Sequence, residues 1–171
     1  VITQVTDNIK DLAINSSELD VSVNVNTGDL KSQESYYLTV TGTSAEAGDD
    51  GNTGRGNRPT GLITPMREYS MEATAGKNPV SHTGKIFSVV AQSASERIAN
   101  EVKGVREIYV RILSQIGAPI NVPQTASASV VLDQDSSLSS VSSEIDSIIR
   151  EELSDLDSVT NKILSGSVTL F

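Results

Sequence analysis

The chain has 171 residues, which is enough for one domain or two small ones with a hydrophobic core. It has no cysteine and a single histidine, so disulfides, thiolate metal sites and multi-histidine metal sites are excluded. The net charge of −9 argues against a nucleic-acid binder, and no apolar run reaches the ~18 residues of a membrane span, so we expect a cytoplasmic protein without a nucleic-acid or membrane partner.

The N-terminal part predicts a helix followed by a β-hairpin. Apolar residues recur at helical spacing over 1–14, which indicates a helix. Strict alternation over 19–26 predicts a half-buried strand. The turn residues Thr-Gly-Asp at 27–29 follow, and aromatic and β-branched residues over 35–42 predict the partner strand.

A long irregular segment, 43–76, holds six of the twelve glycines. A connection of this length is usually functional or disordered. Its stretch GDDGNTGRGNR, at 48–58, contains four glycines beside two aspartates and two arginines. A turn needs one or two glycines, so four indicate that a ligand approaches the backbone closely.

The C-terminal part predicts helices and strands in mixed order. A helix should begin at Asn78-Pro79, with asparagine as N-cap, and end before Gly104. Strands are predicted over 107–113 and 126–132, and then one long amphipathic helix over 138–163.

Gly166 should end that helix, and a short strand should close the chain over 167–171. Without regular β-α-β alternation, the fold class is α+β. We divide the chain into 1–42, the end of a preceding α+β domain, 43–77, a glycine-rich loop that binds phosphate and metal, and 78–171, a C-terminal α+β domain.

Basic residues gather around this loop. The stretch 52–89 has five basic and two acidic residues, a net charge of +3, which leaves −12 for the rest of the chain. A positive island in an acidic chain indicates a local anion site. Uneven surface charge without a ligand is the alternative.

The phosphate-binding candidates are Lys77, Arg55 and Arg58. Lys77 follows Gly76 and precedes a predicted helix, whose N-terminus offers free N–H groups and partial positive charge. A capped surface helix explains that stretch equally well, and it is not a P-loop. The two arginines, three residues apart, could each grip phosphate oxygens with both arms of the guanidinium.

The sequence allows more than one role for three further residues, Asp49, Asp50 and His82. The aspartates could bind magnesium or accept hydrogen bonds from a ligand amine or ribose, although Asx-turns explain either one alone. His82 is either a partly buried structural residue or a ligand-binding one. No serine-histidine-aspartate or cysteine-histidine constellation is identifiable.

The stretch 48–86 resembles the signature region of archaeal-type S-adenosylmethionine synthetases, or methionine adenosyltransferases. Those enzymes have GDDG-x-x-GRGNR-x-x-GLITP, then SMEA-x-x-GKNP, then H-x-GKI, and all three blocks stand here. The resemblance continues through 101–123 and more loosely to the end of the chain, whereas 1–35 carries little of it.

The resemblance implies a transferase that forms S-adenosylmethionine from ATP and L-methionine, releasing phosphate and diphosphate. It also implies a magnesium requirement, assistance by potassium, and a homodimer with active sites at the subunit interface. A thioether nucleophile needs no general base, so the missing catalytic triad does not count against an enzyme. The alternatives are a non-catalytic nucleotide- or polyphosphate-binding module and a structural fragment.

Site residues are implied at matching positions. Asp49 stands where the family places an aspartate near methionine and ribose, and Arg55 where it places an arginine near the triphosphate. Lys77 matches a triphosphate-binding lysine, so Lys77 and Arg55 are the expected catalytic residues. Arg58 would supply the charge that bacterial relatives have at the position of Gly56.

Two departures qualify the resemblance. Thr83 stands where bacterial relatives have a metal-binding aspartate, so no metal ligand is assigned. The family's N-terminal G-H-P-D motif is absent. We therefore expect the chain to be the C-terminal portion of a longer protein, to need the missing N-terminal segment, and to be inactive alone.

Overall fold

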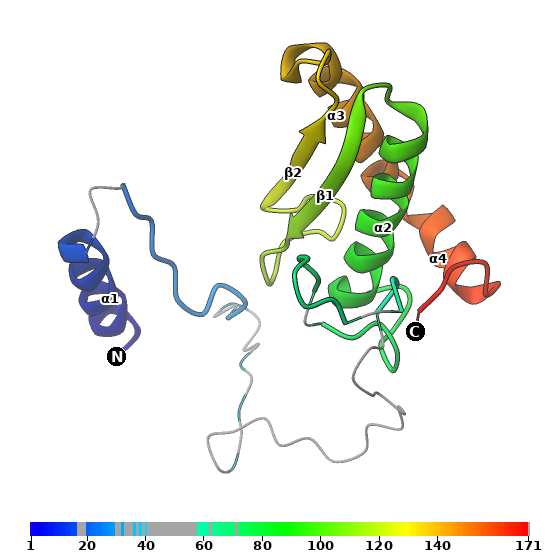
Figure 1. Cartoon of the computed structure of the whole chain (residues 1–171). Coiled ribbons are helices and arrows are strands. Elements are labelled where there is room, and N and C mark those ends of the chain that lie inside the picture. The colour runs from blue at the N-terminus through cyan, green and yellow to red at the C-terminus, as the bar shows by residue number, and fades with distance from the viewer. Residues whose placement is uncertain are drawn as a thin grey trace. The chain divides into compact units, whose positions relative to one another are not determined.

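The computed structural model describes residues 1–16, 20–29, 32, 36, 38, 40, 58–61, 63–70 and 72–170 (Figure 1). The chain divides into two compact units, Val1–Ala45 with Gln115–Gly117, and Glu46–Ser114 with Ala118–Phe171. The three-part division expected from the sequence stays a prediction.

The first unit contains the helix α1, Ile2–Ser16, as predicted. The strand predicted over 19–26 is wrong for its described residues, 20–26, which form no strand. An alternating pattern becomes a strand only where a neighbour completes the hydrogen-bond ladder. The turn that follows is present, because Asp29 donates its backbone N–H to the Asn26 carbonyl at 3.1 Å. Most of the partner strand, 35–42, lies outside the described residues, and Tyr36, Leu38 and Val40 are not in a strand.

The second unit is a two-stranded sheet packed by helices, which confirms the α+β class (Figure 1). Its elements follow in the order α2 (Thr83–Glu101), β1 (Val105–Leu113), β2 (Thr125–Leu132), α3 (Leu138–Ser154) and α4 (Leu156–Leu164). The strands pair antiparallel. The helix α2 packs along β1 and also contacts α3 and α4, so it is the central element of this unit.

The core lies between the three helices of the second unit and is completed by partly buried residues of both strands. Its apolar residues repeat every three or four positions on α2 and α3, the spacing that places side chains on one helix face. The buried members are Ile86, Phe87, Val89, Val90, Ala94, Ile98, Val102, Val141, Ile145, Ile148, Ile149, Leu153, Val159 and Ile163.

The helix α2 begins at Thr83 with His82 as N-cap, four residues later than the predicted start at Pro79 with Asn78 as N-cap. Asn78 does act as a cap, because its side chain accepts the backbone N–H groups of Val80 and Ser81 at 2.8 and 3.1 Å. It caps only a turn, however, and His82 then caps the helix itself by accepting the N–H of Gly84 at its Nδ1. Two capping residues, Asn78 and His82, thus precede α2. The sequence pattern predicts a start at the first of them, which is too early.

The predicted long helix over 138–163 is in fact two helices, separated at Asp155. The Asp155 carboxylate accepts the backbone N–H of Ser158 at 3.1 Å and so caps α4. A short acidic side chain that bonds nearby backbone competes with helix continuation. Gly166 has a φ of +70° after α4, as expected for a helix stop. The closing strand was wrong for its described residues, 167–170, which form none.

Candidate functional site: the start of α2

The start of α2 is held in place by the loop before it and by the core beneath it. Thr74 is fully buried and donates its hydroxyl to the backbone carbonyl of Leu170 at 2.5 Å. Gly76 has a φ of +73°, a conformation that favours glycine, and it turns the loop just before Lys77. Ile86, in the first turns of α2, is buried in the core. Lys77 and Lys85 therefore lie close in sequence to residues that are buried, Thr74 and Ile86.

Lys77 is paired with a carboxylate at the start of α2. Its Nζ lies 3.0 Å from Oε1 of Glu72, and the Lys77 side chain is mostly buried while Glu72 is half-exposed. A Cβ on Gly84 would lie 2.6 Å from Cγ and 2.8 Å from Oε1 of Glu72. The bare backbone of Gly84 thus lets a negative group approach the first turn of the helix. A half-exposed ion pair is worth at most about 1 kcal/mol, so a phosphate could replace this carboxylate.

Lys85 is a second lysine at the start of α2. It is only 7% exposed, and among the residues that the structure describes it is the one charged residue that is buried. Burial, and then the charge of Lys77, lower the pKa of Lys85 below its ordinary value. The two lysines are therefore close enough to repel each other. Sequence reasoning did not assign Lys85, although its position four residues before the buried Val89 places it on a buried helix face.

The sequence predicts free backbone N–H groups at the start of α2, but several of these groups already have acceptors. Val80 and Ser81 donate to the Asn78 side chain, and Gly84 donates to His82. His82 itself donates its backbone N–H to the Asn78 carbonyl at 3.2 Å. These N–H groups are already satisfied, so the binding of an anion here would depend on lysine side chains and the helix dipole. His82 has the structural role of an N-cap.

Arg58 contacts its own loop. Its Nε donates to the backbone carbonyl of Ser70 at 2.9 Å, and its guanidinium carbon lies 5.6 Å from the ring centroid of Tyr69. The latter distance is that of a cation–π contact. The phosphate role expected for Arg58 stays a prediction. The other candidates, Asp49, Asp50 and Arg55, lie outside the described residues.

The described part of the chain has neither a cluster of metal ligands nor a membrane-spanning helix. It contains no group of three or more His, Cys, Asp or Glu side chains that could hold a metal ion. Within the same residues, no helix has the length and apolarity to cross a membrane.

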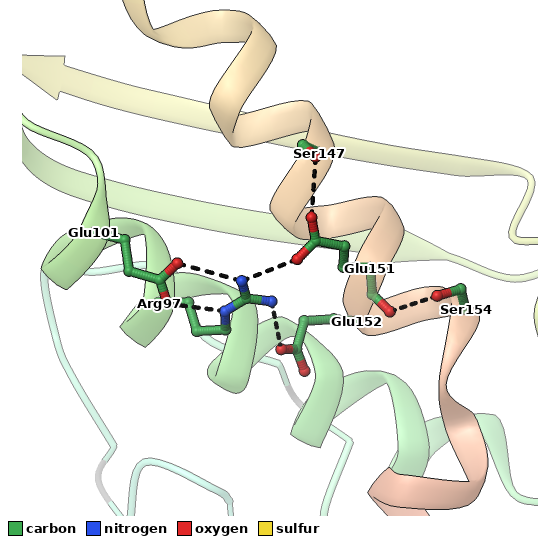
Figure 2. A network of polar contacts seen from close by, with 6 residues as sticks. All are labelled: Arg97, Glu101, Ser147, Glu151, Glu152 and Ser154. Atoms are coloured by element: carbon green, nitrogen blue, oxygen red, sulfur yellow. Dashed lines mark hydrogen bonds and ion pairs between the residues drawn. The ribbon is translucent and has the colours of Figure 1, made fainter.

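A separate polar cluster joins α2 to α3 (Figure 2). Arg97 on α2 donates hydrogen bonds to Glu101 at 2.9 and 3.2 Å, to Glu151 at 3.0 Å and to Glu152 at 3.1 Å. Ser147 donates its hydroxyl to the other carboxylate oxygen of Glu151. A cavity of about 180 Å³ lies beside the cluster, lined by Arg97, Glu151, Glu152, Asp155, Ser158, Val159 and Lys162.

This cluster is a structural connection between helices. Arg97 is satisfied by three carboxylates, two of which belong to α3. The hydrogen bond from Arg97, and then the one from Ser147, lower the pKa of Glu151 below its ordinary value. The carboxylates correspondingly raise the pKa of Arg97. The sequence gives only the spacing of Arg97 and Glu101, because the α3 partners depend on tertiary packing.

Replacing Arg97 by glutamine is expected to weaken the acid dependence of folding. A carboxyl whose pKa is lowered in the folded state stabilises it above the ordinary pKa of 4.5. This contribution is lost as pH falls through the lowered value, and Arg97→Gln removes the main cause of the shift. Melting temperatures at neutral pH and at several values below 4.5 measure the effect.

Arg150→Gln is the matched control, because Arg150 pairs with Asp146 alone in an exposed contact on one helix. The control should keep the acid dependence of the unmodified chain. Parallel melting curves for Arg97→Gln and the unmodified chain would contradict the role assigned to this cluster.

The sequence is similar to known proteins along nearly its whole length. The family model described as S-adenosylmethionine synthetase (AdoMet synthetase) matches residues 1–167. A protein of Pyrobaculum aerophilum named S-adenosylmethionine synthase is 52% identical over 164 residues, which cover 95% of this chain and 40% of that protein. Proteins of the same name from Haloarcula marismortui and Caldivirga maquilingensis are 48% and 49% identical, over 95% and 100% of this chain and 41% of each relative. The chain thus spans about two fifths of the length of these relatives.

Proposed function

This chain belongs to the S-adenosylmethionine synthetase family, and on that premise we propose that it supplies the phosphate-binding part of a methionine adenosyltransferase. The reaction joins ATP, L-methionine and water to give S-adenosylmethionine, phosphate and diphosphate. The methionine sulfur attacks C5′ of ATP and displaces the triphosphate, which water then splits into phosphate and diphosphate. The sulfur needs no general base, so the chief demand on the site is electrostatic.

The observation that carries the proposal is the position of Lys77. The triphosphate leaves with about four negative charges, and preorganised cations stabilise such charge as it develops. Lys77 stands at the positive end of α2, a helix of 19 residues, and its present partner is the half-exposed carboxylate of Glu72. An incoming phosphate would take the place of that carboxylate and form a charge-assisted hydrogen bond with Lys77.

The remaining roles extend the proposal to other residues. Arg55 and Arg58 would contact the triphosphate, and Asp49 would contact the methionine amine or the ribose. Magnesium, assisted by potassium, would help neutralise the phosphate charge. Carboxylates are the ligands that magnesium prefers, so binding of magnesium by Asp49 and Asp50 is the alternative to the ribose or amine contact. We further propose a cytoplasmic homodimer.

A chimera tests the function without assuming what adjoins this chain. This chain would replace the matched 40% of the Pyrobaculum aerophilum relative, to which it is 52% identical. With ATP, methionine, magnesium and potassium, the chimera is expected to form S-adenosylmethionine, measured by mass spectrometry. The 171-residue chain alone is expected to form none.

The unmodified relative is the positive control, and the relative with its matched part deleted is the negative one. A folded chimera without activity would contradict the proposal. Sustained turnover by this chain alone would contradict the requirement for the remainder of the protein.

A further inference from the structure

Arg111 of β1 lies on the face of the sheet that is turned away from the core. Its neighbours in the strand, Val110 and Ile112, both pack against the core, and strand alternation therefore places Arg111 on the opposite face. There its Nη1 donates a hydrogen bond to the hydroxyl of Ser129 on β2 at 2.9 Å. The neighbouring strand thus orients the guanidinium, whose Nε and Nη2 are directed to a different partner.

That partner is Glu68, which lies in the loop before α2. Nε and Nη2 of Arg111 donate to the two carboxylate oxygens of Glu68 at 2.5 and 2.6 Å. This bidentate pairing is the strong and geometrically specific form of an arginine–carboxylate contact. The hydrogen bond from Arg111 also lowers the pKa of Glu68 below its ordinary value, so the carboxylate stays charged at neutral pH. The two residues are 43 positions apart, so the pair joins the loop to the sheet.

Further contacts lead from Glu68 towards Lys77. The hydroxyl of Ser70 accepts the backbone N–H of Glu72 at 3.1 Å, and the Ser70 carbonyl accepts the Nε of Arg58 at 2.9 Å. The Glu72 carboxylate in turn lies 3.0 Å from the Nζ of Lys77. The part of the loop that meets Lys77 therefore begins only a few residues after the attachment to the sheet.

The Arg111–Glu68 pair is better suited to positioning than to stabilisation. Both side chains are exposed, and ion pairs in that setting contribute little to the free energy of unfolding. The geometry is nevertheless specific, because Arg111 is oriented by Ser129 and grips both oxygens of Glu68. Such a contact defines where the loop lies without adding much to the stability of the fold.

We propose that Arg111 and Glu68 are positioning residues, which tether the loop before α2 to the sheet and thereby place Glu72 and Lys77. The proposal rests on the proposed function for the reaction that benefits, and the sequence resemblance assigned neither residue. Neither side chain contacts a substrate in this account. A loop released from the sheet would hold Lys77 in its productive position for less of the time, and reaction rates depend steeply on such placement.

The test measures turnover in the active chimera. Arg111→Gln and Glu68→Gln each remove the bidentate pair. Each is expected to lower the turnover number about 10-fold, since misplacement by ~1 Å can cost ~10²-fold. The apparent affinity for methionine should stay unchanged. Because the two residues act as a pair, the double glutamine variant should lose little more than either single one.

Exchanging the two charges supplies a rescue that a merely structural role would not give. Glu68→Arg combined with Arg111→Glu restores an arginine–carboxylate pair, and the new carboxylate can accept a hydrogen bond from Ser129. This reversed pair should recover most of the turnover. Arg150→Gln is the matched control, because it removes another exposed arginine–carboxylate pair, on α3, and it should leave turnover unchanged.

A second measurement does not depend on activity. NMR order parameters of the 171-residue chain report backbone motion on the picosecond-to-nanosecond timescale. In Arg111→Gln, the backbone amides from Glu72 to Lys77 should become more mobile, whereas those of α2 from Ile86 to Ile98 should not change. The melting temperature should stay close to that of the unmodified chain.

Normal turnover in both single variants would overturn the proposal, as would unchanged order parameters or a reversed pair that recovers nothing. A lower melting temperature that accounts for the lost turnover would assign the pair a structural role instead. An active chimera that is unaffected by Arg111→Gln would refute this inference and leave the proposed function standing. An inactive unmodified chimera would contradict the proposed function, whereas the order parameters would still test the tether.

Discussion

Lys77→Met is expected to slow S-adenosylmethionine formation by the active chimera about 10²-fold or more. Loss of one preorganised electrostatic contact to developing charge has an effect of this size. The side chain keeps its apolar stem and loses only the ammonium that pairs with Glu72. The turnover number should fall more than the apparent affinity for methionine, because the lost contact is to the leaving phosphate.

Melting temperature distinguishes a catalytic effect from unfolding. The Lys77–Glu72 pair is half-exposed on the Glu72 side, and such pairs contribute about 0–1 kcal/mol to stability. Lys77→Met should therefore melt close to the unmodified protein, and the exposed control Lys103→Met should keep both stability and turnover. Near-normal turnover by Lys77→Met, or a loss fully explained by unfolding, would remove Lys77 from the phosphate site.

Ile98→Ala is expected to destabilise the second unit by about 2–5 kcal/mol, the usual cost of truncating a buried isoleucine. Ile98 is 0% exposed on α2, the helix that contacts β1, α3 and α4. Its loss removes apolar burial and leaves a cavity in the core. Denaturant unfolding of the 171-residue chain, followed by circular dichroism, measures the change.

Leu113→Ala is the control for this prediction, because Leu113 is 57% exposed at the end of β1. It should change the free energy of unfolding by less than about 0.5 kcal/mol. Equal effects of the two variants would mean that the described core does not determine the stability of this unit.

The sequence predicted the helices of the second unit better than their boundaries. Apolar residues at three- and four-residue spacing identified the buried faces of α2 and α3, because burial against a core requires that spacing. The start of α2 was missed because Asn78 and His82 both have capping side chains, and their backbone conformation decides which one caps the helix. The break at Asp155 was missed because apolar periodicity continues from Leu153 to Leu156.

Alternating patterns predicted the strands of the second unit but not one in the first. The alternation in 107–113 and 126–132 corresponds to β1 and β2, which pair with each other and cover the core. The same kind of pattern over 20–26 forms no strand. Alternation reports which side chains could share a face, but pairing depends on residues distant in sequence.

The candidate site was only partly predictable, because the local sequence does not show which distant residues come together in the fold. Lys77 could be found because a Gly-Lys pair precedes a helix, which is a local feature. Glu72 and Lys85 could not, because their roles depend on how the loop folds against Gly84 and on burial. The resemblance identified the family, whereas the structure supplied the environment of each lysine.

The central claim is that the first turn of α2 binds the phosphate chain. An NMR titration of the isotopically labelled 171-residue chain with inorganic tripolyphosphate tests it most directly. The largest backbone amide shifts are expected from Gly76 to Ile86, with little change along α4. Largest shifts elsewhere, such as around the cluster of Arg97, or none at saturating tripolyphosphate, would contradict the claim.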